Sequence, residues 1–375
     1  MKKRIIAYIT YTLAVCCMLC ACRRDEADKT KRLKDLGIPL IETYTNETEQ
    51  EIRARRSEDM VIYDGRLYVG CGDYDTNMGP VSVVCYDISE GEWQISPEVL
   101  EDEQIKRFLV LDGTLCIPGT DPRGDWSMGN YYTLSDGGWQ TQRVLPSGIH
   151  CFDGLIFEGR TFFGLGVNSG DYPVAVSDGE GFRSVAFMRD GELVDTSAFE
   201  FVRTYNLTVW QDQLFAFLTL GNTDSIAYEV YRYDGESFVY YSTPPEVFWR
   251  GYDMAHTGAF ADLGVFINGY CYFTTEDMVS FRPRQVGDSD LACDMLVLED
   301  TLYVLAYREL EKGYESAVYA TRDGKTFEKL FYFQKEIPAG AFAYENGVFY
   351  FSMGRYYDAE SHEMGRVFSL PFSLD

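Results

Sequence analysis

The chain has 375 residues, and its 59 acidic residues outnumber its 33 basic ones, which gives a formal net charge of −26. A protein this acidic repels phosphate backbones and anionic lipid surfaces, so nucleic-acid binding and adsorption of the protein body to an anionic membrane are excluded. The chain is long for one ordinary domain, but its length suits a single domain built from repeats.

Residues 1–21 have the features of a secretory signal peptide. Lys2, Lys3 and Arg4 form a positively charged start, and an apolar stretch then runs from 5 to 19. This stretch is short and contains several polar residues, so a membrane-spanning helix is disfavoured. The sequence therefore predicts an exported protein.

The end of this signal, Leu19-Cys20-Ala21-Cys22, resembles the lipobox of bacterial lipoproteins. The resemblance implies a lipid on Cys22 and a place in the cell envelope outside the cytoplasm, with membrane contact only through the lipid. An ordinary cleaved signal or an anchor helix is the alternative. The acidic pair Asp25-Glu26 is similar to the surface-export signals of some lipoproteins, and it extends the expectation to the cell surface. Residues 22–37 are charged and lack periodicity, so we predict a flexible tether there.

From residue 38 to residue 375, a pattern of four short strands recurs about seven times, and we interpret this region as one domain. A tight turn joins the first two strands of each repeat. The turns are Asp64-Gly65, Asp112-Gly113, Glu158-Gly159, Gln211-Asp212, Asp262-Leu263-Gly264, Glu299-Asp300 and Glu345-Asn346. Their spacing of roughly 37–55 residues is typical of propeller blades. We therefore predict an all-β fold, a seven-bladed β-propeller of four-stranded antiparallel blades. A β-sandwich is the main alternative, but such domains are much shorter.

The last repeat supplies only three strands, at 341–344, 348–353 and 367–370. A missing fourth strand would leave an unpaired sheet edge. The segment 38–45 is apolar and rich in residues that favour strands. We predict that it pairs as the outer strand of the last blade and closes the ring.

Six cysteines follow the signal region: Cys71, Cys85, Cys116, Cys151, Cys271 and Cys293. No two of them form a Cys-x-x-Cys pair, so thioredoxin-like and zinc-ribbon interpretations have no support. An even number in an exported protein permits disulfides, whereas their apolar neighbours favour buried thiols. The sequence leaves their disulfide state open.

Four turns between third and fourth strands carry a recurring Asp-Gly motif followed by an aromatic residue. They begin at Ser135, Ser177, Tyr233 and Thr321. The motif resembles the Asp-box of sialidase-type propellers, which implies a propeller fold and a structural role away from the active face. The Arg-Ile-Pro motif of sialidases is not found, so no catalytic residue of that family is carried over.

The position five residues before each strand-joining turn is mostly polar. These positions are Asp59, Arg107, Asp153, Asn206, Thr257, Asp294 and Gly340. In a propeller they ring the mouth of the central channel, on the face that carries the long loops. Three carboxylates close together could hold a cation or raise one another's pKa. The alternative is that each side chain bonds the backbone of a neighbouring blade.

Further candidates lie on the same face. The loop Asp121-Pro122-Arg123-Gly124-Asp125-Trp126 combines two carboxylates, an arginine and a tryptophan, a set that suits a sugar ring. The alternative is that Trp126 packs on the next blade. His150 and His256 fall near the starts of two inner strands, where they should face the mouth, and His150 beside Asp153 is an acid/base candidate.

Asp73, Asp75 and Asn77 alternate as oxygen ligands do in calcium loops. The glycine and the terminal residue depart from the EF-hand spacing, so calcium is a weak candidate. No other cofactor is expected.

These features favour a lipid-anchored, extracytoplasmic propeller that binds a glycan or a protein partner on its long-loop face, and we expect a monomer. The alternative is a carbohydrate-active hydrolase or lyase, sialidase-like, that uses Asp59, Asp153, Asp294 or His150 as acid and base. The missing catalytic signature favours the binding module.

Overall fold

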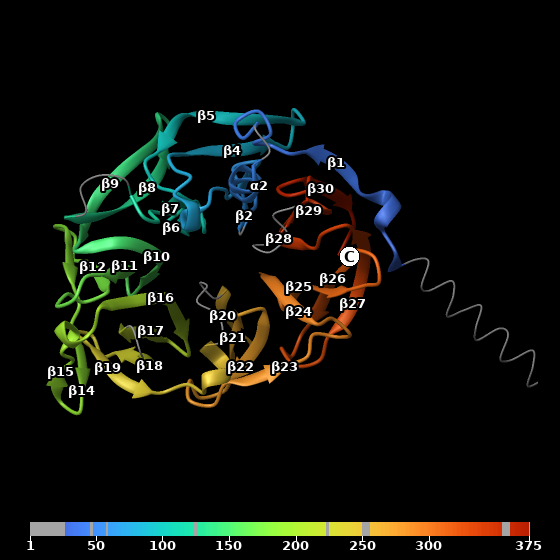
Figure 1. Ribbon diagram of the computed structural model, residues 1–375. Coiled ribbons are helices and arrows are strands. Elements are labelled where there is room, and N and C mark those ends of the chain that lie inside the picture. The colour runs from blue at the N-terminus through green and yellow to red at the C-terminus, as the bar shows by residue number, and fades with distance from the viewer. Residues whose placement is uncertain are drawn as a thin grey trace, which may run out of the picture.

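The computed structural model describes residues 27–45, 48–57, 59–122, 127–222, 225–249, 256–354 and 361–374. Antiparallel sheets radiate around a central axis, as Figure 1 shows, so the fold is a β-propeller. The candidate residues Arg123, Asp125 and Trp126 and the lipidation candidate Cys22 lie outside the described residues. In the described part, no helix is both long and apolar enough to span a bilayer.

Five sheets are four-stranded blades, and the strands of four of them follow one another along the chain. These four contain β2 (Met60–Tyr63), β3 (Arg66–Val69), β4 (Val81–Asp87) and β5 (Glu92–Leu100); β6 (Leu109–Leu111), β7 (Thr114–Pro118), β8 (Met128–Ser135) and β9 (Gly138–Pro146); β20 (His256–Phe260), β21 (Leu263–Asn268), β22 (Cys271–Thr275) and β23 (Arg282–Arg284); and β24 (Leu291–Leu298), β25 (Thr301–Glu309), β26 (Tyr314–Thr321) and β27 (Glu328–Lys335).

The sixth sheet has ten strands and spans the middle of the chain. It contains β10 (Gly148–Phe157), β11 (Arg160–Val167), β12 (Val174–Ser177), β13 (Phe182–Ser184), β14 (Phe187–Arg189), β15 (Glu192–Leu193), β16 (Phe201–Trp210), β17 (Gln213–Asn222), β18 (Ser225–Tyr233) and β19 (Phe238–Ser242). The prediction of seven four-stranded blades is therefore wrong. Five blades of that kind are present, and the strands assigned to two further blades are joined in one sheet.

The junction of the large sheet has a steric cause in β11. Gly166 and Val167 of β11 pair with Arg203 and Val202 of β16. Two residues earlier, a Cβ atom on Gly164 would lie 2.6 Å from the carbonyl oxygen of Thr204, closer than real Cβ contacts. Glycine at 164 thus allows β16 to approach β11 closely enough for the two strands to pair.

The ring closes through the N-terminal part of the chain, but not through the predicted segment. β1 (Lys34–Gly37) pairs antiparallel with β30 (Val367–Pro371), and β29 (Val348–Met353) and β28 (Ala339–Glu345) complete this fifth blade. The closing strand therefore lies at 34–37, within the stretch expected to be a tether, and the prediction of a strand at 38–45 is wrong.

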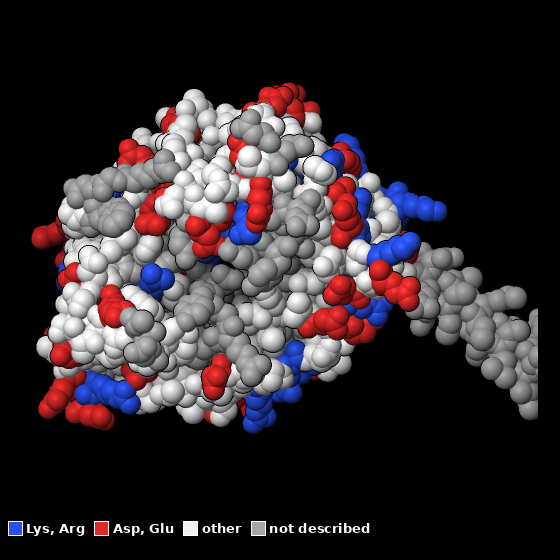
Figure 2. Space-filling model, in the orientation of Figure 1, with Lys and Arg blue, Asp and Glu red and all other residues white. Residues whose placement is uncertain are grey.

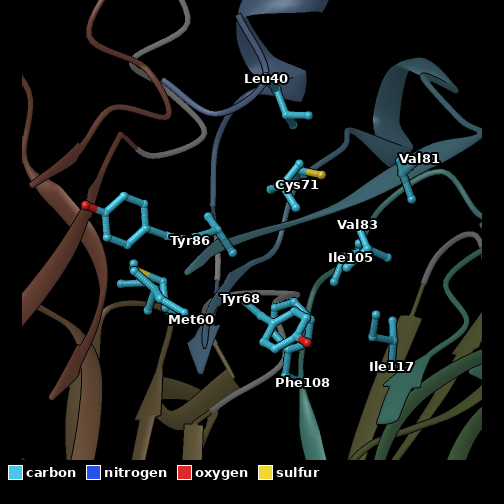
Figure 3. Close-up of a cluster of buried hydrophobic side chains, with 14 of the residues drawn as sticks. Leu40, Met60, Tyr68, Cys71, Val81, Val83, Tyr86, Ile105, Phe108 and Ile117 are labelled. Carbon is cyan, nitrogen blue, oxygen red and sulfur yellow. The ribbon is translucent and has the colours of Figure 1, made fainter. Parts of the chain in front are cut away.

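Residues 38–45 form turns because their own sequence satisfies them locally. Pro39 has no N–H to donate to a strand ladder. The N–H groups of Thr43 and Tyr44 bond the carbonyl of Leu40, at 3.1 and 3.0 Å. The side chains of Leu40 and Tyr44 are buried, and Figure 3 shows Leu40 in the apolar cluster that also holds Met60 and Cys71. The apolar character that predicted a strand instead docks this segment on the core.

Helices are short and peripheral in the described chain. They are α2 (Glu49–Ala54) and the 3₁₀ turns η1 (Thr30–Arg32), η2 (Tyr74–Thr76), η3 (Thr196–Ala198) and η4 (Glu246–Trp249).

Five of the seven tight turns between first and second strands were predicted correctly. The fifth lies at Ala261-Asp262 instead of Asp262-Leu263-Gly264, and the seventh at Asn346-Gly347 instead of Glu345-Asn346. Asp64 and Gly65 have φ values of 49° and 70°, and Asp112 and Gly113 have 48° and 74°. Positive φ at both central residues is the geometry of two-residue hairpins that match the strand twist. These turns place the starts of all the first strands on the opposite face, where the long loops lie.

All six cysteines after the signal region are free thiols. Cys71, Cys116, Cys151 and Cys293 are buried, as their apolar neighbours indicated, whereas Cys271 is exposed. Burial raises the pKa of Cys71 to about 12, so this thiol stays protonated and inert.

Candidate functional site

The strands nearest the axis are β2, β6, β10, β16, β20, β24 and β28, and from β6 round to β2 each of them contacts the next. Asp153 and Asp294 each follow an extra residue that bulges out of the ladder, between Cys151 and Asp153 in β10 and between Ala292 and Asp294 in β24. Such bulges re-aim the next side chain. They direct these carboxylates along the ring, toward the neighbouring strand.

The three ring carboxylates make the same contacts. Asp59 accepts the N–H of Met60 at 2.9 Å and of Phe108 at 2.6 Å; Asp153 accepts those of Gly154 and Leu207, each at 2.9 Å; and Asp294 accepts those of Met295 at 2.7 Å and Phe342 at 2.9 Å. In each case one bond comes from the next residue in the chain. The other comes from the backbone in or directly before the inner strand of a different repeat. Asp59 and Asp294 therefore bond the backbone next to a neighbouring sheet, as the alternative interpretation expected, whereas the bond of Asp153 joins two strands of the ten-stranded sheet.

A cavity of about 420 Å³ opens at the centre of the ring. Its polar lining includes Asp59, Arg107, Asp153, Thr208, His256 and Thr257. Its apolar lining includes Phe108, Leu109, Leu155, Leu207, Val209 and Met295. The face shown in Figure 2 is hollowed near its centre, with acidic and basic side chains scattered around it. This volume is within the range of small-molecule sites.

One ion pair and one histidine–carboxylate contact lie beside this cavity. Arg107 Nη1 lies 2.8 Å from Asp153 Oδ1, and His256 Nδ1 lies 3.2 Å from Asp294 Oδ1. The Asp294 side chain is only 6% exposed, whereas that of His256 is 24% exposed. Burial raises the pKa of Asp294 well above its ordinary value, and the negative charge of Asp59 acts in the same direction. Asp59 and Arg107 line the same cavity as His256.

Several predicted ring residues do not share this cavity. Asn206 is buried in β16, and it is the next residue, Leu207, that lines the cavity wall. Thr257 does line the cavity, and its hydroxyl bonds the carbonyl of Leu207 at 3.3 Å. Gly340 packs near the backbone of Gly354.

His150 lies apart from the cavity, near Asp121. Its Nδ1 is 4.0 Å from Asp121 Oδ1, and its ring stacks on Phe152 at 5.4 Å. Burial, followed by the charges of Arg203 and Lys106, lowers the pKa of His150 to about 3. The imidazole is therefore neutral at physiological pH, which disfavours the predicted role of His150 as an acid/base group.

The three weak calcium candidates do not converge on one point. Asp73 is fully buried, lies 3.6 Å from Arg56 and accepts the hydroxyl hydrogen bond of Thr76. Asp75 is exposed, and the amide of Asn77 faces Glu103. Within the described ranges, no group of three or more His, Cys, Asp or Glu side chains is arranged to hold a metal ion.

The sequence interpretation missed the apolar wall of the cavity and the pairing of His256 with Asp294. The wall had a usable signal, because Leu109 and Leu155 follow Arg107 and Asp153 by two residues and so share their strand face. The sequence contains no signal for the His256–Asp294 pair, because the two residues lie on inner strands that become neighbours only when the ring forms.

No family model matches the chain, and no curated protein matches it. Its fold is similar to that of a catalytically inactive variant of virginiamycin B lyase from Staphylococcus aureus, solved with quinupristin, at a TM-score of 0.50 and 9% identity over 91% of this chain and 99% of that one. A PL25 ulvan lyase bound to a GlcA–Rha3S saccharide gives 0.48 and 13%, over 82% of this chain and 90% of that one. BamB from Moraxella catarrhalis gives 0.43 and 10%, over 84% and 85%. At 9% identity, the similarity to virginiamycin B lyase shows only that the fold is a propeller. The TM-scores of the other two structures are lower, and no argument is based on them.

Proposed function

We propose that this propeller is a binding module that takes its ligand at the central cavity, with a glycan as the first choice and a protein segment as the second. The observation that carries the proposal is the cavity itself, which has a polar rim and an apolar wall at the axis of the ring. A few placed polar groups beside an apolar surface are typical of small-ligand sites.

The contacts of the ring carboxylates favour binding over glycoside hydrolysis. That reaction uses two carboxyl groups, one as acid and the other as base or nucleophile. Both oxygens of Asp59, Asp153 and Asp294 already accept backbone N–H groups. Using any of them as a proton carrier would disturb the bonds that hold the ring together.

The charges at the rim favour an uncharged ligand. Among the described residues that line the cavity, Asp59 and Asp153 are acidic and Arg107, which is paired with Asp153, is basic. Together with the net charge of −26, this leaves a negative potential that repels anionic sugars. We therefore propose a neutral glycan, held by hydrogen bonds at the rim and by contact with the apolar wall.

The remaining expectations belong to this proposal. Arg123, Asp125 and Trp126 would also contact the glycan, with Trp126 stacking on a sugar ring. A lipid on Cys22 would hold the propeller, as a monomer, at an extracytoplasmic membrane surface.

A cavity-filling variant tests the proposal. A Cβ on Gly258, which lines the cavity, would have no neighbour closer than 3.8 Å, so the backbone there has room for a side chain, and Gly258→Leu is chosen to reduce the volume of the cavity. The matched control is Gly181→Leu, because a Cβ there meets nothing within 4 Å. We expect a glycan array and calorimetry to show binding by the wild type and Gly181→Leu and loss with Gly258→Leu. Trp126→Ala should weaken the same binding. An array and a pull-down that both return no ligand would contradict the proposal.

A further inference from the structure

His256 and Asp294 have the geometry of a proton-transfer pair. His256 stands at the start of β20 and lines the cavity, whereas Asp294 lies behind it in β24. The contact between them runs from the imidazole Nδ1 to Asp294 Oδ1, at 3.2 Å. A carboxylate in this position holds the proton on Nδ1, which makes Nε2 the basic nitrogen of the neutral ring.

Asp294 is well fixed for such a role. Its two oxygens accept the N–H groups of Met295 at 2.7 Å and Phe342 at 2.9 Å, and its side chain is almost fully buried. Since both anchors are backbone groups of the propeller ring, the carboxylate cannot rotate away from the imidazole. A base oriented by a third group in this way is a general feature of catalytic centres.

We infer that the central cavity is a site of proton-transfer chemistry, in which His256 is the base and Asp294 is the residue that positions it. The inference goes beyond ligand binding and depends on the proposed function only in using the same cavity. The chemistry that fits is an elimination, because it needs one base, whereas glycoside hydrolysis needs two free carboxyl groups.

The steps of such an elimination balance within the site. Nε2 of His256 removes a proton from a carbon of the substrate, and the C–H electron pair becomes a new π bond. The bond from the adjacent atom to its leaving oxygen breaks, and that oxygen takes the electron pair. The imidazolium then returns its proton to the leaving oxygen or to water. Arg107, which lines the same cavity, provides the positive charge that stabilises the electron-rich transition state.

The charged groups around His256 set its pH response. They are Asp294 behind it and Asp59, Arg107 and Asp153 on the other first strands that line the cavity. Only the neutral ring can accept a proton at Nε2, so the rate of proton removal should rise with pH as the imidazolium loses its proton.

A generic elimination probe tests the inference without knowledge of the natural substrate. 5-Nitrobenzisoxazole loses its carbon-bound proton to a base, its N–O bond breaks, and a coloured phenolate is released. We expect wild-type protein to accelerate this reaction and His256→Gln to lower the rate at least about tenfold, the low end for a single general base. Asp294→Asn should lower the rate and move its pH midpoint, and His362→Gln, at an exposed position, should change neither. A wild-type rate equal to that of His256→Gln would overturn the inference.

A second measurement uses only the unaltered protein, so it stands even if a variant fails to fold. The chain has three histidines, which makes each resonance assignable in protein labelled with ¹⁵N-histidine. We expect the neutral His256 ring to carry its proton on Nδ1. A neutral ring with its proton on Nε2 would overturn the inference. Because neither experiment uses a glycan, a blank glycan array would leave both results standing.

Discussion

The carboxylate of Asp153 accepts the backbone N–H of Leu207 at 2.9 Å, across 54 positions of the chain and from one first strand to another. Asp59 and Phe108 repeat this relationship, as do Asp294 and Phe342. Three acidic side chains thus connect the first strands around the axis, in addition to the apolar packing between sheets. These bonds explain why acidic residues stand in the ring. They also limit the use of these carboxylates as acids or bases, because both oxygens already accept backbone N–H groups.

Replacing Asp153 with alanine should therefore destabilise the fold. The change leaves the N–H of Leu207 without this acceptor and the side chain of Arg107 without its carboxylate partner at 2.8 Å. Leaving a buried N–H donor without its acceptor and a charge without its partner lowers the free energy of unfolding by on the order of 3–5 kcal/mol. Urea denaturation should show this loss. Asp190→Asn, in an exposed turn, is the control and should change stability by less than about 0.5 kcal/mol. If Asp153→Ala were equally neutral, the connecting role would be refuted.

Gly164→Ala should strain the junction of the ten-stranded sheet. The new methyl group would lie 2.6 Å from the carbonyl oxygen of Thr204, and because that atom belongs to the backbone, β16 itself must shift. We expect a loss of about 1–3 kcal/mol, typical of overpacking. Hydrogen exchange should quicken at Arg203, whose partner in β11 is Gly166. Gly181→Ala is the control, and equal protection in both variants would contradict this account.

A chain that begins at residue 38 should be much less stable than one that begins at residue 27. It lacks β1 and with it the ladder to β30, the bond from the Trp93 indole to the carbonyl of Leu36 at 2.6 Å and the ion pair of Asp35 with Arg366 at 2.7 Å. The free edge of β30 should also promote aggregation. Thermal unfolding and light scattering would report both effects. Equal melting temperatures for the two chains would show that β1 does not close the ring.

Stability should increase as the pH falls from 8 to about 5, and Asp102 should account for part of the increase. Burial raises the pKa of this carboxyl to about 6, against partly opposing hydrogen bonds from Tyr132 and Asn130. The folded state therefore binds the proton more tightly than the unfolded chain, whose carboxyl keeps a pKa near 3.8. This contribution is fully present below the unfolded pKa and is lost as the pH rises through 6, by about 3 kcal/mol.

The variant Asp102→Asn should flatten this pH dependence and be at least as stable as the wild type at pH 8. Below pH 4 the trend reverses, because hydrogen bonds from the backbone N–H groups of their own turns lower the pKa of Asp234 and Asp323. Their contribution is present above the unfolded pKa and disappears as they are protonated. Melting temperatures measured between pH 3 and pH 8 would check both the rise in stability down to about pH 5 and its fall below pH 4. A wild-type curve that falls steadily from pH 8 to pH 5 would contradict the role of Asp102.

Local features of this fold could be predicted from the sequence, and long-range ones could not. The turns at Asp64-Gly65 and Asp112-Gly113 were predictable because Asp and Gly tolerate positive φ and stand between two apolar runs. The joining of β11 to β16 was not, since it depends on how closely Gly164 approaches a strand that follows much later. The turn at 38–45 shows the same limit, because its apolar residues suit a strand and a docked turn equally well.

The site divides in the same way. Alignment of the strand-joining turns placed seven residues at the channel mouth, and four of them, Asp59, Arg107, Asp153 and Thr257, line a common cavity. Whether the carboxylates would bond ligand or backbone was left open, because the answer depends on which N–H groups the next strand presents. His256 was expected at the mouth, but its partnership with Asp294 required coordinates.

The pairing of β1 with β30 constrains the order of biosynthesis. Ribosomes make β1 long before β30, so the strand that seals the propeller must wait until residues 367–371 have been translated. Until then the nascent chain carries an open ring with two unsatisfied edges, and a chain cut short before residue 367 can never seal it.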